Sequence, residues 1–175
     1  MRTVFLLSIC SFLLLSCDKS TKYVNVTIND QYTLSLPDDM VSADLSEKAS
    51  LQYQSPQREL YTLVLDESKE TLNGFGLEYD LATYMQVAIH NLDSTSKQKP
   101  VEQKIGPYKA LHIGLKKKVN NKGRTYDAVY RLTVIETPKY FYQLLTWTMD
   151  GWYERNRTDI EHIDGSFKEL PASKK

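Results

Sequence analysis

The sequence predicts an α+β fold, in which helices cover both faces of an antiparallel β-sheet. Two observations lead to this prediction. Residues 106–149 have the pattern of a three-stranded meander with apolar side chains on both faces, whereas a sheet with one face in water alternates cleanly. Amphipathic helices are predicted on either side of this meander, over residues 77–92 and about 152–164. Helices on both faces of a sheet make a three-layer α/β/α sandwich.

The elements follow one another along the chain without an internal repeat. Alternating apolar residues predict the strands, and turn-forming residues such as Asn29-Asp30 and Ser55-Pro56 separate them. Apolar residues recurring at spacings of three and four predict the first helix. The predicted elements in chain order are strands 23–28, 32–36, 49–54 and 59–65, helix 77–92, strands 108–118, 125–136 and 139–149, and helix 152–164.

The register of the meander depends on its two turns. In the first turn, Gly123 suits a left-handed position in a three-residue loop, but a two-residue loop is equally open. The two-residue loop aligns Leu111, Ile113 and Leu115 with Leu132, Tyr130 and Ala128. For the last two strands, taking Thr137-Pro138-Lys139 as the turn, parity predicts two faces. One carries Ala128, Tyr130, Leu132, Val134, Tyr142 and Leu144, and the other carries Val129, Ile135, Phe141, Leu145 and Trp147.

Length and composition narrow the class of protein. The chain has 175 residues, about the size of one domain. It has 22 basic and 22 acidic residues, and this balance gives no electrostatic reason to expect a nucleic-acid partner. Two cysteines cannot form a disulfide-rich scaffold.

The N-terminus predicts an exported and lipidated protein. Residues 1–3 form a short segment with one basic residue, Arg2, and the 12 residues of 4–15 are apolar apart from two serines. This segment fits an export signal and is too short to span a bilayer. Leu14-Leu15-Ser16-Cys17 resembles the lipobox of bacterial lipoproteins, which implies cleavage before Cys17 and attachment of lipids such as palmitate to its thiol and amine. The alternative is an ordinary signal peptide with an incidental cysteine.

The predicted organisation is therefore a signal peptide over residues 1–16, a lipidated Cys17 with a short tether to residue 22, and one domain over 23–175. The lipid anchor at Cys17 would hold this domain at the cell membrane or the outer membrane, most simply facing the periplasm.

The order of elements and three short motifs resemble one family. The motifs are Tyr-Thr-Leu-Ser-Leu-Pro at 32–37, Gly-Pro-Tyr-Lys-Ala at 106–110 and Ser-Phe at 166–167. Over about residues 23–170 the chain resembles the PsbP-like family, which also includes a Mog-type binder of a nuclear GTPase. The resemblance implies an antiparallel α/β/α sandwich used as a binding or assembly module. It implies no reaction, and no functional residue is carried over with it.

The residues themselves predict no catalytic or metal site. The three histidines His90, His112 and His162 lie on three separate predicted elements and lack the spacing of a zinc site. No nucleophile elbow, Ser-x-x-Lys set or phosphate-binding loop is present. We therefore expect a non-enzyme without a cofactor.

Three groups of surface candidates remain. Eight aromatic residues fall within 126–153, and tyrosine and tryptophan are enriched at interfaces as well as in strands. A basic hairpin could contact anionic headgroups or simply protect an exposed strand edge. Asp93-Ser94-Thr95 resembles an acceptor for O-glycosylation in some bacterial envelopes. The candidates are Tyr140, Tyr142, Trp147, Trp152 and Tyr153 for interaction, Lys116, Lys117 and Lys118 for the basic hairpin, and Ser94 and Thr95 for glycosylation.

The leading hypothesis for function is a membrane-anchored binding or assembly module with a protein partner. A carrier of a small apolar ligand between the sheet and one helix is the alternative, and an uncharacterised hydrolase is the third. A large apolar pocket would favour the carrier, whereas a closed core with an exposed aromatic patch would favour the protein partner.

Overall fold

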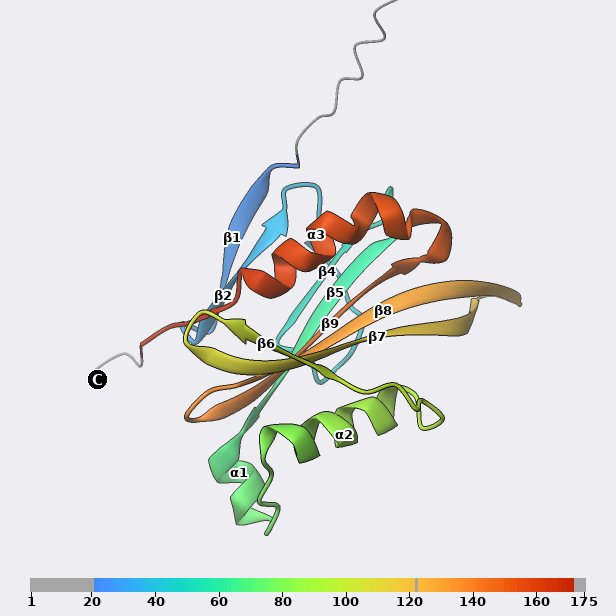
Figure 1. The fold of residues 1–175 in the computed structure, drawn as a ribbon. Helices are drawn as coiled ribbons and strands as arrows, with labels where there is room; N and C mark the ends of the chain where they lie inside the picture. The colour runs from blue at the N-terminus through green and yellow to red at the C-terminus, as the bar shows by residue number, and fades with distance from the viewer. Residues whose placement is uncertain (1–20, 122, 172–175) are drawn as a thin grey trace, which may run out of the picture.

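The structure, a computed structural model, describes residues 21–121 and 123–171 and contains two antiparallel sheets (Figure 1). The main sheet has the strand order β3 (Val41–Ser42), β4 (Leu51–Ser55), β5 (Leu60–Ser68), β9 (Tyr140–Met149), β8 (Arg124–Glu136), β7 (Tyr108–Asn121) and β6 (Val101–Ile105). The second has the order β1 (Tyr23–Ile28), β2 (Tyr32–Pro37) and β10 (Lys168–Glu169). The helices are α1 (Lys69–Gly74), α2 (Leu81–Leu92) and α3 (Tyr153–Gly165), with a single 3₁₀ turn at Asp150–Trp152 before α3.

The layers confirm the predicted sandwich. Helix α2 lies on one face of the main sheet, and α3 lies on the opposite face (Figure 1). The small sheet shares the α3 side, because Leu34 and Leu36 of β2 pack into the same core as Ile160 and Ile163 of α3. One outer layer therefore consists of a helix and a small sheet side by side.

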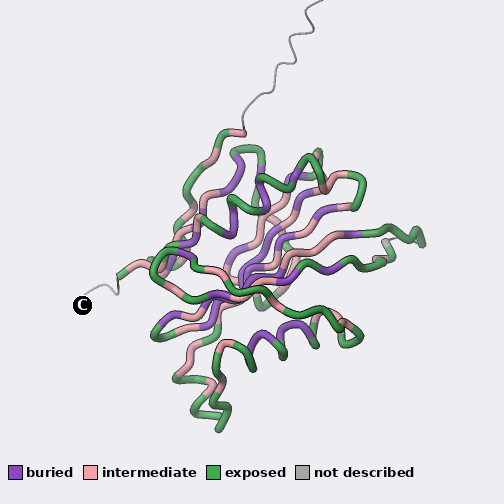
Figure 2. Tube along the Cα trace, in the orientation of Figure 1, coloured by how far each residue is buried: buried purple, intermediate pink, exposed green. Residues whose placement is uncertain are grey.

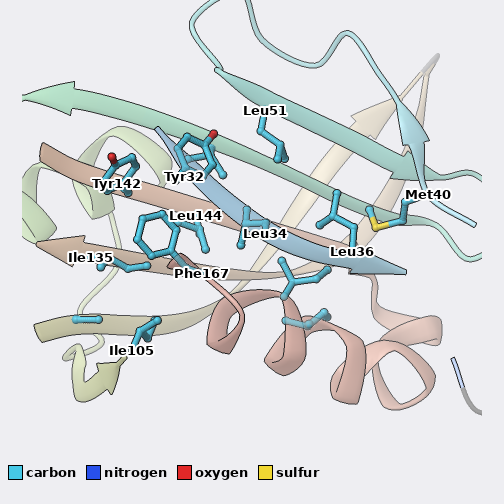
Figure 3. Close-up of a cluster of buried hydrophobic side chains, with 14 of the residues drawn as sticks. Tyr32, Leu34, Leu36, Met40, Leu51, Ile105, Ile135, Tyr142, Leu144 and Phe167 are labelled. Atoms are coloured by element: carbon cyan, nitrogen blue, oxygen red, sulfur yellow. The ribbon is translucent and has the colours of Figure 1, made fainter. Parts of the chain in front are cut away.

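Two apolar cores hold the layers together, and buried residues line the interior of the molecule (Figure 2). The core on the α3 side is rich in aromatic rings, and Tyr32, Tyr142 and Phe167 lie in mutual contact within it (Figure 3). The core under α2 centres on Tyr84, whose ring stacks on Phe141 of β9 with ring centroids 4.3 Å apart. Burial of these side chains supplies the main driving force for folding.

The faces of the last two strands differ from those predicted. Tyr130 pairs with Trp147, and Leu132 pairs with Leu145, so these residues share the α2 side of the sheet. The predicted grouping of Leu132 with Tyr142 and Leu144 on one face is wrong, and so is that of Trp147 with Ile135. On the α3 side, Tyr142 pairs with Ile135, and Leu144 pairs with Thr133.

The physical reason is the length of the turn between these strands. Thr137 and Tyr140 close the turn through a 2.9 Å backbone hydrogen bond from Thr137 N to Tyr140 O, which leaves only Pro138 and Lys139 between them. A turn of two residues instead of three shifts the parity of every side chain on the following strand.

The first hairpin has a two-residue turn. Asn121 pairs with Arg124, and Gly123 adopts the left-handed conformation with φ of 79°. Leu111, Ile113 and Leu115 face Val134, Leu132 and Tyr130, which is two residues away from the predicted alignment but on the same side of the sheet.

The predicted helix over 77–92 is too long at its start. Helix α2 begins at Leu81, because the side chain of Asp80 caps it by accepting a 2.7 Å hydrogen bond from Thr83 N. The segment before it contains α1, which is not among the predicted elements, and the short strands β3, β6 and β10 are not among them either.

Polar contacts hold the start of β1 against α3. The hydroxyl of Tyr23 donates to Asp159 at 2.5 Å, and its ring stacks on His162 with centroids 3.7 Å apart. Arg58, in the turn before β5, pairs with the same Asp159. Tyr23, the start of β5 and the middle of α3 therefore meet at one end of the molecule.

The predicted signal peptide and Cys17 lie outside the described residues. Within residues 21–121 and 123–171, no helix is both long and apolar enough to cross a bilayer.

Candidate binding surface

The five aromatic candidates do not form a single patch. Tyr142 is fully buried, and its hydroxyl accepts a hydrogen bond from Gln31 at 3.1 Å, so it belongs to the core and not to a surface. Tyr140 and Tyr153 are half-buried and pack against the same core. Trp152 is half-buried before α3, where the guanidinium of Arg155 lies 5.1 Å from its ring centre.

Trp147 belongs instead to a row of three aromatic rings across the α2 side of the main sheet. It is the direct register partner of Tyr61 on β5 and of Tyr130 on β8. The ring centroids lie 5.2 Å and 5.8 Å from that of Trp147, with interplanar angles of 12° and 19°. All three residues are half-buried. We call Tyr61, Trp147 and Tyr130 the aromatic row.

The aromatic row extends beyond the part of the sheet that α2 covers. The core under α2 is formed mainly by β7, β8 and the start of β9, with Ile113, Leu132 and Phe141 fully buried. Tyr130 and Leu145 are half-buried at the edge of this core, whereas Tyr61 and Trp147 do not belong to it. Stacked cross-strand rings stabilise a sheet and hold one another in place. The rings of the row are therefore already ordered, and a partner that binds this apolar surface would lose little conformational entropy in them.

The hydroxyl groups of the aromatic row stay protonated at neutral pH. Burial and the neighbouring Glu59 carboxylate, which accepts a 2.7 Å hydrogen bond from the Tyr61 hydroxyl, raise the pKa of Tyr61 to about 12. Burial also raises the pKa of Tyr130. The row is thus uncharged, with hydroxyl and indole N–H groups as its polar tips.

The three lysines of the basic hairpin are divided between structural contacts. Lys116 pairs with Asp150 at 2.8 Å, and this hydrogen bond raises the pKa of the lysine. Lys117 donates a 2.7 Å hydrogen bond to the carbonyl oxygen of Leu92, where it complements the negative end of α2. Lys118 is exposed and opposes Asp127 across the hairpin. The ammonium groups of Lys116 and Lys117 are therefore engaged by contacts within the protein.

A buried polar cluster lies between the main sheet and α3. The carboxylate of Asp164 accepts hydrogen bonds from Arg131 Nε at 2.5 Å and from Thr133 Oγ1 at 2.6 Å. Burial raises the pKa of Asp164 to about 6, against the opposing effects of Arg131 and Thr133. His112 opposes Thr133 across the strand pair, and burial, together with Arg131, lowers its pKa.

This cluster lacks the geometry of a catalytic set. His112 Nδ1 and Asp164 Oδ1 have no hydrogen-bond partner among the described residues, and neither residue lines the hollows of about 410, 530, 610 and 700 Å³ on the surface. General acid–base catalysis requires a group within reach of a substrate. Nor do those residues contain a group of three or more His, Cys, Asp or Glu side chains placed to hold a metal ion.

Four surface hollows have volumes of about 410 to 700 Å³, and apolar, polar and charged side chains are mixed in their linings. The hollow of about 610 Å³, between the start of α2 and strands β6 and β7, illustrates this. Its lining includes two apolar leucines and the charged residues Asp80, Glu102, Lys104, Lys109 and Glu136. Such a lining does not match a small apolar ligand.

The glycosylation candidates lie in an exposed turn after α2. Asp93 Oδ1 accepts hydrogen bonds from Thr95 N at 3.0 Å and from Thr95 Oγ1 at 2.7 Å, and Ser94 and Thr95 are exposed. The turn is thus accounted for by its own hydrogen bonds, and glycosylation at Ser94 or Thr95 stays a prediction.

Sequence reasoning missed Tyr61 and Tyr130 as parts of one surface. Tyr61 lies 86 positions before Trp147 in the sequence and is predicted only as a strand residue. The signal that unites them is the β5–β9 register, which depends on tertiary pairing. Phe75, which is 77% exposed in the loop after α1, was likewise not singled out.

The comparisons with known proteins identify the fold. The chain matches no family model, and no curated protein matches it. It is similar to the Saccharomyces cerevisiae Ran-binding protein Mog1p, with a TM-score of 0.57 and 11% identity over 88% of this chain and 98% of that chain. It is also similar to LpqN, involved in cell envelope biogenesis of Mycobacterium tuberculosis, with a TM-score of 0.54 and 16% identity over 88% of this chain and 94% of that chain.

A protein of Bacteroides thetaiotaomicron VPI-5482 matches with a TM-score of 0.53 and 12% identity over 82% of this chain. The chain spans about half of that protein, 47% of its length. Identities this low show the fold alone. The chain thus has the antiparallel α+β fold of Mog1p and LpqN, as the resemblance to a Mog-type protein predicted.

Proposed function

We propose that this protein is an envelope lipoprotein, anchored through Cys17, whose domain binds a protein partner without catalysing a reaction. The observation that carries the proposal is the aromatic row, a half-exposed stack of three rings on a sheet face that α2 covers only in part. Tyrosine and tryptophan are the residues that most often supply binding energy at protein interfaces.

The rest of the molecule supports a binding role over the carrier. Apolar side chains form its two cores, and the hollows of about 610 and 700 Å³ have several charged residues in their linings. Of two proteins with the same fold, Mog1p is a Ran-binding protein, and LpqN is involved in cell envelope biogenesis.

The test is crosslinking at the aromatic row in the cell. Gln54 is half-buried and is the register partner of Tyr61 on the neighbouring strand, so a photoreactive amino acid at position 54 would lie beside the row. Illumination of the full-length lipoprotein should yield an adduct with another protein. Trp147→Ala should reduce that adduct by about tenfold or more, because central aromatic anchors dominate interface energies.

Tyr126→Ala is the matched control, because Tyr126 is a 39% exposed aromatic residue near the start of β8. It should leave the adduct at position 54 unchanged. An adduct that persists at full yield in Trp147→Ala, or that is lost equally in both variants, would contradict the role of the aromatic row.

A further inference from the structure

A second exposed aromatic residue lies at the tip formed by α1 and the loop that follows it. Phe75 is 77% exposed, and its neighbour Leu77 is 40% exposed. Isolated exposed apolar residues are common on protein surfaces, so exposure alone does not mark a binding site. The backbone around Phe75 and the charges beside it distinguish this residue from the others.

The backbone of the tip is held at both ends of α1. The Ser68 hydroxyl caps the start by accepting a 3.3 Å hydrogen bond from Thr71 N. At the end, Leu77 N donates to Leu72 O at 3.0 Å and Gly76 N donates to Asn73 O at 2.8 Å. Together with the positive φ of Gly76, 72°, this pair of bonds is the Schellman motif.

The base of α1 is tied to the main sheet through Lys69. Its backbone N–H donates to Lys139 O at 2.9 Å, and its Nζ pairs with Glu136 at 2.6 Å. The same Nζ lies 4.7 Å above the centre of the Phe141 ring. Phe75 is therefore presented on a fixed backbone, and a partner that binds it has little ordering entropy to offset.

The tip carries more acidic than basic side chains, and the basic residue Lys139 of the β8–β9 turn lines a hollow together with Glu70. Residues 66–80 contain five acidic residues and one lysine, and that lysine is already paired with Glu136. Glu70, Glu78 and Asp80 are exposed on either side of Phe75 in the sequence. A surface with positive charge would complement these carboxylates, whereas anionic lipid headgroups would repel them.

The position of the tip also argues against a lipid surface. Tyr23, where the tether enters the domain, shares Asp159 with Arg58 beside the start of β5, and α1 follows directly from the other end of β5. The nine residues of β5 span about 30 Å at roughly 3.4 Å per residue. Figure 1 shows the start of β1 and α1 at opposite ends of the molecule.

We infer that Phe75 and Leu77 form a docking anchor for a protein partner that presents an apolar pocket with a basic rim. This inference deepens the proposed function and rests on it, because the tether at Cys17 is what keeps the Tyr23 end at the membrane. A tether of six residues reaches about 20 Å at most. The anchor therefore points away from the membrane, toward a partner in the envelope space.

The experiment places a photoreactive amino acid at Asn73, an exposed residue of α1, in the full-length lipoprotein in the cell. Illumination should give an adduct with another protein. Phe75→Ala should reduce this adduct by about tenfold or more. The double variant Glu70→Lys/Glu78→Lys should reduce it to a similar extent, because it reverses the charges that face the basic rim.

Val24→Ala is the matched control, because Val24 is a 48% exposed apolar residue on the edge strand β1, and it should leave the adduct unchanged. Each variant should keep the thermal unfolding midpoint of the parent, since the altered side chains are exposed. With the crosslinked partner purified, its affinity should fall as salt concentration rises and should fall about tenfold or more in Phe75→Ala.

Three outcomes of the crosslinking would overturn the inference. These are an adduct with lipid, an adduct with a second copy of this chain, and the absence of a protein adduct that depends on both Phe75 and the acidic residues. Binding of Phe75-bearing protein, but not of Phe75→Ala, to vesicles of phosphatidylethanolamine and phosphatidylglycerol would also overturn it. Because the proposed function is tested separately at position 54, a failure at the tip alone would leave the aromatic row in place.

Discussion

Asp164 is a buried carboxyl group whose position has a consequence for stability. It lies at the end of α3, fully enclosed, and accepts hydrogen bonds from Arg131 and Thr133. Burial raises its pKa to about 6 from 3.8, so between about pH 4 and 6 the folded protein holds a proton that the unfolded chain has released. The higher pKa of Asp164 in the folded state therefore stabilises the fold at low pH. This contribution is largest below about pH 4 and is lost as the pH rises through 6.

We therefore predict a pH-dependent difference between the parent protein and Asp164→Asn, which cannot ionise. The free energy of unfolding of the parent relative to the variant should increase by about 2 kcal/mol as the pH falls from 7 to 4, toward a full value of about 3 kcal/mol at lower pH, at about 1.4 kcal/mol per pKa unit. Denaturant unfolding of both proteins at several pH values measures this difference. A constant difference across this range, or one that grows toward pH 7, would show that the carboxyl group is not perturbed in this direction.

At the scale of elements, the end of α1 depends on one glycine. Gly76 has a φ of 72°, a conformation that residues with a Cβ adopt only at an energetic cost, whereas Gly74 lies within α1. At both positions an added Cβ would have no atom of the surrounding fold within 4 Å, so a change to alanine causes no steric clash with it. We predict that Gly76→Ala destabilises the tip by about 1 kcal/mol, and that Gly74→Ala is neutral or slightly stabilising.

Hydrogen exchange measures this effect locally. The amide protons of Gly76 and Leu77 donate to carbonyl groups of α1, so residue 77 in particular should exchange faster in Gly76→Ala and not in Gly74→Ala. Equal exchange in the two variants would mean that the left-handed conformation at residue 76 does not hold the tip in place.

The elements that could be predicted from the sequence are those with a long periodic pattern. The hairpin at 23–36, the three meander strands and α3 all fall within a few residues of their predicted bounds, because each carries enough alternating or helical periodicity to outweigh its neighbours. The first helix was predicted to start four residues too early, because Leu77 continues the helical spacing although Gly76 has already ended α1.

Other features could not be read from the sequence because they depend on pairing across the fold. Strand β6 spans only five residues, with exposed Val101, Glu102 and Lys104, and its pairing with β7 fixes it in place. The aromatic row required the β5–β9 register, and a turn one residue shorter than expected moved Trp147 to the α2 side. Local patterns leave such parity open.

At the scale of the whole molecule, the predicted anchor determines which end faces the membrane. We predict that Cys17→Ala leaves the protein unprocessed or misplaced, because the thiol that would carry the lipid is gone. Fractionation of cells, with the mature mass determined by mass spectrometry, measures both effects. Ser16→Ala is a suitable control, because a small residue is kept before the cysteine and processing should continue.

The opposite result would be a Cys17→Ala protein that is cleaved beyond residue 17 and still partitions with the membrane. The N-terminal segment would then act as an ordinary signal peptide, and the contact with the membrane would have to come from the folded domain.

The small sheet joins segments near the two ends of the described chain, and this would affect how the chain acquires its fold if it is exported as predicted. Thr33 and Tyr32 of β2 pair with Lys168 and Glu169 of β10, across more than 130 positions of sequence. Leu34 and Leu36 are buried only when α3, near the end of the chain, lies beside them. Contacts of such long range form late, because the intervening chain must first be brought together. A chain that emerges from a translocation channel N-terminus first would hold its first hairpin without a complete core until almost the last residue has passed.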